Sequence, residues 1–90
     1  MAETRWTPGP WHADREFDIC GEDGHVIADC FGKPANARLI AAAPELYEAL
    51  ANIVPRFERA CAHAGSDEEF IAEATATARA ALAKARREMP

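Results

Sequence analysis

The amino-acid sequence predicts an α+β fold, in which a short antiparallel β-hairpin or three-stranded meander is followed by a short helix and an Ala-rich antiparallel helical hairpin. Alternating apolar and polar residues indicate the strands, and the pair Asp23-Gly24 favours a tight turn between two of them. Ala-rich segments whose larger apolar residues recur at spacings of three and four indicate the helices. We expect one domain, 1–90, with the sheet in 11–33 and the helices in 35–88.

The N-terminal segment, residues 1–10, is expected to be an extended arm. Pro8 and Pro10 restrict the residues before them to extended geometry. Two short strands are then expected over Trp11–Asp14 and Glu16–Cys20, the second of which alternates between an apolar and an acidic face.

The returning strand is expected over His25–Phe31. Its alternation places Val26, Ala28 and Cys30 on one face and Ile27 on the other. The three segments form a meander if the Trp11 segment pairs with its neighbour, and a bare hairpin if it does not.

A short helix is expected over Ala35–Ala43, with Leu39, Ile40 and Ala43 on one side. Pro44 interrupts this helix and opens a longer one, since Pro is tolerated in a first helical turn. One apolar stripe runs along the longer helix and consists of Leu46, Leu50, Ile53, Phe57 and Cys61. Pro55 is expected to kink or split that helix.

The last helix is expected to begin after Gly65 and to run to about Arg87. Ser66-Asp67-Glu68-Glu69 fits a capping box in which the Ser66 hydroxyl binds the backbone N–H of Glu69. A seam of small residues follows, made of Ile71, Ala74, Ala78, Ala81 or Leu82, and Ala85. Because Ala lets helix axes approach closely, we expect the apolar stripe to pack antiparallel against this seam.

The hydrophobic core is expected to be thin, since Ala fills much of the apolar fraction and removes little surface from water. Small domains of this kind usually need disulfides, a metal or self-association. Cys20, Cys30 and Cys61 fit neither a disulfide framework nor a metal motif, and no signal peptide precedes them, so we expect reduced thiols in a cytoplasmic protein. Self-association remains, and we expect a homodimer or larger assembly that uses the helical seam.

Acidic residues are concentrated in the sheet half of the chain. The formal net charge is -5, and residues 1–34 carry seven acids against three bases, whereas residues 35–90 carry eight against seven. This distribution argues against direct nucleic-acid binding and favours a partner with a basic surface. The candidate partner-binding residues are Asp14, Glu16, Asp18, Glu22, Asp23 and Asp29. No apolar run is long enough to span a membrane.

Catalysis and metal binding are not expected. The single Ser, Ser66, is explained as a helix cap, and an acid pair such as Asp14 and Asp29 is expected by chance among fifteen acids. A four-residue turn would place Cys20 opposite His25, but a structural zinc site needs four ligands. We therefore predict no enzyme activity, no metal and no cofactor.

Three residues have the chemistry that stacks a base or binds a phosphate: Trp11, Phe31 and Arg38. Arg38 is expected to open the first helix. Trp11 and Phe31 are also among the largest apolar residues of the sheet, and we favour a core role for both because a thin core has few other sources of buried area.

Two motifs resemble those of a widespread group of small proteins encoded by bacteriophages and prophages. They are TPGPW at Thr7–Trp11 and NARLIAAAPELYEAL at Asn36–Leu50, and the resemblance covers about half of the chain. The group typically shows TPGPW, a hairpin with Asp-Gly at its turn, and NARLIAAAPELLEAL. Tyr47 stands where Leu is usual in that pattern.

The resemblance implies a phage accessory protein in the cytoplasm of an infected or lysogenic host. Small acidic phage proteins of this kind often look like inhibitors of bacterial immunity. One mechanism is anti-CRISPR-like docking of the acidic sheet on a basic surface of an effector complex, which blocks DNA loading. A second is an oligomeric sponge for a cyclic nucleotide immune signal, which would use Trp11, Phe31 and Arg38. A structural or regulatory phage protein is the third. The net charge favours the first.

Overall fold

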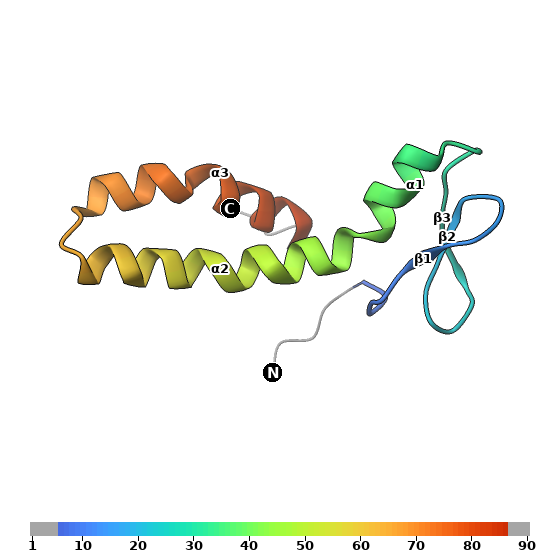
Figure 1. Ribbon diagram of the computed structural model, residues 1–90, viewed down its shortest axis with the longest axis horizontal. Helices are drawn as coiled ribbons and strands as arrows, with labels where there is room; N and C mark the ends of the chain where they lie inside the picture. The colour runs from blue at the N-terminus through green and yellow to red at the C-terminus, as the bar shows by residue number, and fades with distance from the viewer. Residues whose placement is uncertain (1–5, 87–90) are drawn as a thin grey trace. The chain divides into compact units, whose positions relative to one another are not determined.

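The computed structural model describes residues 6–86, so part of the predicted arm (1–5) and the predicted helix end at Arg87 lie outside the described residues. The chain divides into two compact units, residues 1–46 and 47–90. The first contains the strands and the first helix, and the second contains most of α2 and all of α3 (Figure 1).

The first unit holds a three-stranded antiparallel sheet in the order β1-β2-β3. The strands are β1 (His12–Ala13), β2 (Asp18–Cys20) and β3 (Val26–Asp29). The predicted meander is therefore confirmed, and the segment after Trp11 pairs with its neighbour, although each strand is shorter than predicted.

A bulge in β3 corrects the predicted faces of that strand. Ile19 pairs with Ala28 and Cys20 pairs with Val26, so Ile27 is an extra residue in the ladder. Ile27 and Ala28 both pack against the core, whereas Val26 is 60% exposed. Cys20 also lies opposite Val26 rather than His25. The cause is the longer connection, in which the Gly21 N–H donates to the His25 carbonyl (3.1 Å) and Gly24 has a φ of 84°.

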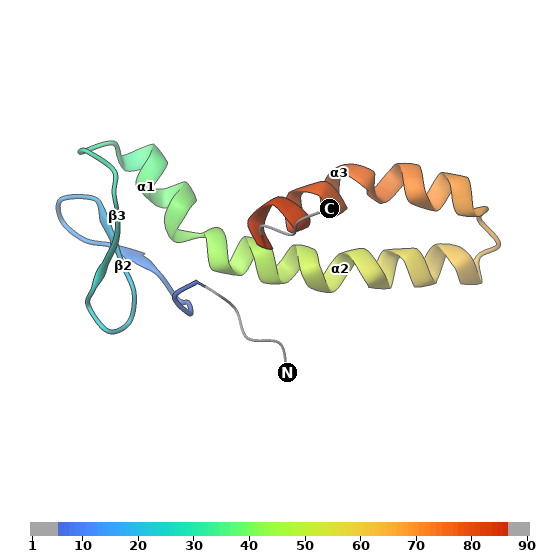
Figure 2. The same ribbon diagram turned by 180° about the vertical axis from the view of Figure 1, so that it is seen from behind.

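Helix α1 (Pro34–Ala41) is joined to β3 by a short loop (Figure 2) and begins with Pro34 in its first turn, one residue before the predicted start. Ala37 is fully buried against Ile19 and Cys30, and these three residues form the core of the first unit. Trp11, Phe17, Ile27, Ala28, Ile40 and Ala41 pack around them. Leu39 is 66% exposed, so its predicted place beside Ile40 is wrong. Helix α1 comes closest to the sheet at position 37, where only a small side chain fits.

The two motifs meet at Gly9. A Cβ atom at Gly9 would lie 2.8 Å from the Cβ of Pro44, so only a glycine lets the backbone come this close. The Trp11 indole N–H donates to the Thr7 carbonyl (2.9 Å) and fixes the segment between them. The motif glycine therefore serves packing within the first unit.

Helix α2 (Ala43–His63) contains Pro55 without being split, so of the two predicted alternatives, a kink or a split, the split is wrong. Pro55 is exposed, so the carbonyl of Ala51 that it cannot bond is left to water rather than to the core. The helix ends in a Schellman motif: the Ser66 N–H donates to the Cys61 carbonyl (3.0 Å), the Gly65 N–H donates to the Ala62 carbonyl (3.1 Å), and Gly65 has a φ of 87°.

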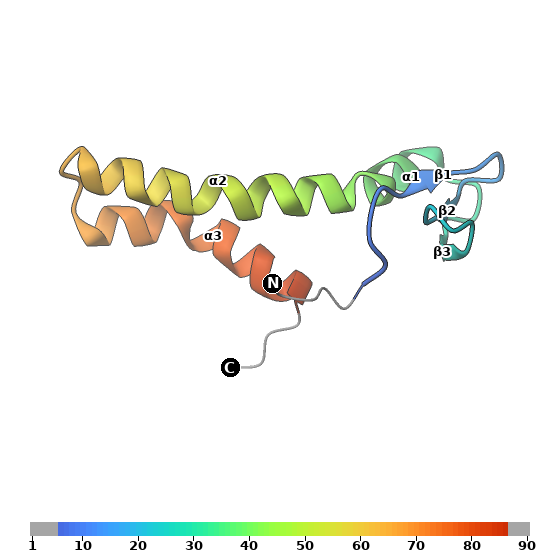
Figure 3. The same cartoon turned by 90° about the horizontal axis from the view of Figure 1, so that it is seen from below.

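Helix α3 (Glu68–Arg86) folds back along α2 (Figure 3), as the predicted helical hairpin requires. Its N-cap is Asp67, whose carboxylate accepts the Phe70 N–H (2.8 Å). The predicted capping box at Ser66 is therefore wrong by one residue, because Ser66 completes the turn after α2. No helix within residues 6–86 is long and apolar enough to cross a membrane.

The buried residues of the helical pair match the predicted stripe and seam in part: Leu50, Ile71, Ala78 and Leu82 were predicted, whereas Val54 and Thr75 were not. Val54, Thr75 and Leu82 are buried, and Leu50, Ile71 and Ala78 are half-buried. Most of the predicted stripe is exposed instead: Leu46 54%, Ile53 57% and Phe57 40%. One neighbouring helix covers only part of an apolar stripe this wide, so its outer edge remains in solvent.

Candidate functional site: an acidic cluster beside an exposed phenylalanine

Three carboxylates gather on the sheet, and we call Asp14, Asp18 and Asp29 the acidic cluster. Asp18 and Asp29 lie directly opposite each other on β2 and β3. Asp14 precedes β2, and its Oδ1 accepts the backbone N–H groups of Glu16 (2.9 Å) and Asp18 (3.0 Å). The tight turn before β2 therefore brings a third carboxylate to the pair.

The acidic cluster is electrostatically unfavourable in the isolated chain. The pKa of Asp18 is raised by desolvation and by the nearby Asp29 carboxyl, with further repulsion from Asp14 and Glu16. Within residues 6–86, no Lys or Arg forms an ion pair with these acids. Like charges directly opposite in a sheet destabilise it. The part of the chain that the structure describes therefore gives the cluster no counter-charge.

The other predicted acids are arranged differently. Glu22 and Asp23 lie in the β2–β3 turn, at the opposite end of the ladder from the Asp18–Asp29 pair. Asp23 accepts the His25 N–H (3.0 Å) and lies 3.1 Å from His25 Nδ1, and these contacts lower its pKa. Asp23 thus has a His side chain beside it as well as a backbone N–H donor, whereas the hydrogen bonds that Asp14 and Asp29 accept come mainly from backbone N–H groups.

Phe31 is the residue that the sequence placed wrongly. It was favoured for the core but is 81% exposed. Its φ of 51° is a left-handed conformation that is costly for Phe, and the Asp29 carboxylate accepts its backbone N–H (2.7 Å). An acidic cluster residue therefore helps to hold an exposed aromatic ring in place.

The predicted nucleotide-binding residues do not form a common site. Trp11 packs against the core of the first unit, as predicted for a core residue. Arg38 is exposed in the last turn of α1 and does not open that helix. Among the described residues, no hydrogen bond or cation–π contact joins Trp11, Phe31 and Arg38.

Cys20, Cys30 and Cys61 are free cysteines, of which Cys20 and Cys30 are buried. Cys20 is buried, its Sγ lies 4.0 Å from Asp14 Oδ2, and its pKa is raised by desolvation and by repulsion from Asp14, Asp18 and Asp23. A raised pKa keeps the sulfur as a thiol, which is the less nucleophilic form. In the part of the chain that the structure describes, no group of three or more His, Cys, Asp or Glu side chains could hold a metal ion.

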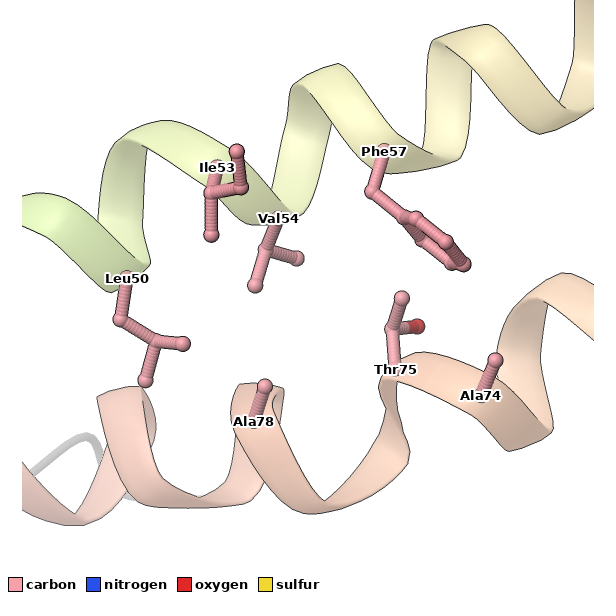
Figure 4. Close-up of a pocket in the computed structure, with 7 residues that line it drawn as sticks. All are labelled: Leu50, Ile53, Val54, Phe57, Ala74, Thr75 and Ala78. Atoms are coloured by element: carbon pink, nitrogen blue, oxygen red, sulfur yellow. The ribbon is translucent and has the colours of Figure 1, made fainter.

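An apolar groove of about 250 Å³ lies between α2 and α3 (Figure 4). Its lining residues are Leu50, Ile53, Val54, Phe57, Ala74, Thr75 and Ala78. The Thr75 hydroxyl, its one polar side-chain group, lies within hydrogen-bonding distance of the Ile71 carbonyl (2.9 Å) and of Glu58 Oε2 (3.1 Å). The groove therefore offers apolar contact rather than sites for a charged ligand.

An ion pair between Glu58 of α2 and Arg79 of α3 joins the two helices on their polar side. Glu58 accepts hydrogen bonds from Arg79 Nε (2.7 Å) and from the second guanidinium nitrogen, and the bonds from Arg79 lower the pKa of Glu58. Near the other end of the pair, Arg86 Nε donates to the Tyr47 hydroxyl (2.6 Å) and the guanidinium lies 5.7 Å from the ring centre. These contacts fix α3 along α2.

Asp18→Asn is expected to raise the melting temperature at pH 7. Because the folded-state pKa of Asp18 is raised above the ordinary value of 3.8, folding is favoured while the carboxyl is protonated, and that advantage is lost as the pH rises through the folded pKa. Asn cannot ionise, so the gain over wild type should be present at pH 7 and absent at about pH 3, below the unfolded pKa. Thermal unfolding at both pH values measures it. Glu69→Gln, at an exposed residue of α3, is the control. A lower melting temperature for Asp18→Asn than for the wild type at pH 7 would contradict the cluster electrostatics.

Comparison with known proteins supports the phage resemblance. A family model described as Salmonella phage P22 protein Y8K6 matches residues 1–89. No curated protein and no solved structure matches the chain. The match extends beyond the two motifs and includes the helical pair, so the chain belongs to the phage-encoded family of Salmonella phage P22 protein Y8K6.

Proposed function

We propose that this phage protein inhibits bacterial immunity by non-catalytic binding, in the manner of an anti-CRISPR protein. The acidic cluster and Phe31 dock on a basic, DNA-loading surface of a host immune effector complex. The observation that carries the proposal is a set of three carboxylates without a counter-charge among the described residues, next to an exposed aromatic ring.

The acidic cluster gains more from a basic partner than scattered surface acids do. In the free protein the pKa of Asp18 is raised by desolvation first, and then by repulsion from Asp29 and Asp14. Lys or Arg side chains of a partner relieve that repulsion when they bind. Complementary charge also accelerates encounter between the two proteins.

Phe31 adds apolar contact at the edge of the acidic cluster. Binding energy is usually concentrated in a few aromatic or Arg side chains that become desolvated at the centre of an interface. Phe31 is 81% exposed, and its backbone is held by Asp29, so little ordering is needed when it is buried. The charges supply orientation and the ring supplies buried area.

The nucleotide sponge is less well supported. The exposure of Phe31 suits base stacking, but Asp29 two residues away repels phosphate. Among the described residues, no hydrogen bond or cation–π contact joins Arg38 or Trp11 to the Phe31 ring. A sponge predicts that a cyclic nucleotide raises the melting temperature with its concentration. A panel of such signals tests this directly, and a shift would replace the protein-partner proposal.

A plaque assay tests the proposed function in cells. Hosts that each carry one CRISPR-Cas system express the chain, the double variant Asp18→Lys/Asp29→Lys, or the matched control Glu68→Lys/Glu69→Lys on exposed α3. Wild type and control should restore phage plating on at least one host, whereas the cluster variant should not, because like charges across an interface cost several kcal/mol. Equal rescue by the cluster variant would contradict the acidic-cluster mechanism. Failure of wild type on every host would favour a structural or regulatory role.

Binding of the variants to the purified effector complex from a rescued host separates the contribution of the acidic cluster from that of Phe31. Asp18→Asn/Asp29→Asn should weaken binding and flatten its dependence on salt, because fewer screened charges take part. Phe31→Ala should weaken binding without changing the salt dependence. Binding that is insensitive to salt in the wild type would contradict charge-driven docking.

A further inference from the structure

We infer that two copies of the chain associate through the exposed edge of α2, which packs antiparallel on α2 of the second copy and so completes a four-helix bundle. The contact surface consists of Leu46, Leu50, Ile53 and Phe57 on α2, with Phe70 and Ala74 beside them on α3, and we call it the apolar face. Figure 4 shows the side chains of Leu50 and Phe57 directed into the groove between α2 and α3. This inference is independent of the proposed function.

The apolar face is unusually exposed for a chain of this size. Among the described residues, Leu46, Ile53, Phe57 and Phe70 are 54%, 57%, 40% and 53% exposed. By contrast, Ile19 is the only large side chain that is fully buried within residues 6–86. Large apolar residues that recur along one helix edge, next to an apolar groove, are typical of an interaction surface.

The dimensions of the helical pair suit a dimer. Helix α2 has 21 residues and is therefore about 31 Å long, and two adjacent helices are about 20 Å wide, which gives a projected face of about 600 Å². A standard protein interface removes about 800 Å² of accessible surface from each partner, and accessible surface exceeds projected area because side chains protrude. One face of the pair is thus sufficient for a stable dimer.

The apolar spacing specifies an antiparallel register. The stripe residues are separated by four, three and four positions, so a two-fold axis midway along them places Leu50 opposite Ile53 of the second copy and Leu46 opposite Phe57 of the second copy. Large side chains then meet large side chains in every layer. The same surface serves both copies, as a closed dimer requires.

Charge at the margin of the stripe favours a second copy in this orientation. Helical spacing places Glu45 and Arg56 on the same flank of the stripe, near its two ends. In the antiparallel register, Glu45 of each copy lies within two residues, about 3 Å, of the level of Arg56 of the other, on the same side of the contact. In a parallel pair the two flanks lie on opposite sides of the contact, so these charges would not meet. Pro55 lies on the opposite side of the helix and does not obstruct the contact.

Sedimentation equilibrium of the full chain tests the dimer. The expected mass is twice 9.8 kDa. Ile53→Glu should weaken association roughly 100-fold or more, since it places a carboxylate in the apolar layer. Leu39→Glu, at a side chain that is 66% exposed on α1, is the matched control and should leave the dimer unchanged. A monomer at protein concentrations up to about 1 mM would overturn the inference, as would equal effects of the two substitutions.

Charge reversal tests the identity and orientation of the occupant without altering the apolar layers. Arg56→Glu should weaken the dimer, because it places Glu against Glu45 of the second copy, and Glu45→Arg/Arg56→Glu should restore it. Both residues are exposed, so circular dichroism should show wild-type helicity for each variant. Failure of the double reversal to restore the dimer would overturn the antiparallel register.

Discussion

Ile19→Ala is expected to lower the free energy of unfolding by about 2–5 kcal/mol, the usual cost of removing most of a large buried side chain. Ile19 is fully buried and lies on the central strand, against Cys30 and Ala37. A domain of this size has about 5–13 kcal/mol of total stability, so the loss is a large share of it. The cavity would be poorly filled, because Cys30 and Ala37 have small side chains.

Urea titration followed by tryptophan fluorescence measures this loss, since Trp6 and Trp11 both belong to the first unit. Val26→Ala is the matched control on the neighbouring strand, at a β-branched side chain that is 60% exposed. It should change the free energy of unfolding by no more than about 0.5 kcal/mol. Similar losses for the two variants would show that the core is not centred on Ile19.

The element order could be predicted because local signals determine it. The Asp23-Gly24 turn, the prolines before Trp11 and the proline at position 44 each act on the adjacent backbone. The faces of β3 could not be predicted, because alternation assumes a regular ladder and the bulge at Ile27 adds one residue. The buried side of α1 was missed because Ala37 gives no hydrophobic signal, yet its small size allows the closest approach.

The helical pair shows a second limit. Helical periodicity predicted an apolar stripe along α2, but it does not say which edge of the stripe a neighbouring helix covers. Val54 of α2 and Thr75 of α3 are buried in the helical pair, and much of the stripe is left in solvent. Thr75 was not predicted there because its hydroxyl needs a partner, which the Ile71 carbonyl and Glu58 supply only once the helices have formed.

The sequence predicted which residues belong to the candidate site but not how they are arranged in space. Asp14, Asp18 and Asp29 were all named from their charge, but only the strand register shows that they meet. Phe31 was placed in the core because large aromatic residues are usually buried. The signal that it is exposed was the segment Asp29-Cys30-Phe31-Gly32, in which an Asp side chain and a following glycine favour a turn.

Leu82→Ala is expected to cost the helical pair about 2–5 kcal/mol, which is the second large effect. Leu82 is 4% exposed and is the largest side chain of the α3 row that contains Thr75 and Ala78. Urea titration followed by circular dichroism at the helical band measures the loss. Leu39→Ala removes the same atoms from a position that is 66% exposed, and it should cost less than about 1 kcal/mol.

Protein concentration separates this intramolecular contact from the proposed dimer. Unfolding of a dimer shifts to higher urea as the concentration rises, because association stabilises only the folded chains. Leu82→Ala should lower the midpoint at every concentration and keep that shift, whereas Ile53→Glu should abolish the shift and lower the midpoint little at high dilution. If Leu82→Ala instead removed the concentration dependence alone, Leu82 would belong to the interface between copies and not to the contact between α2 and α3.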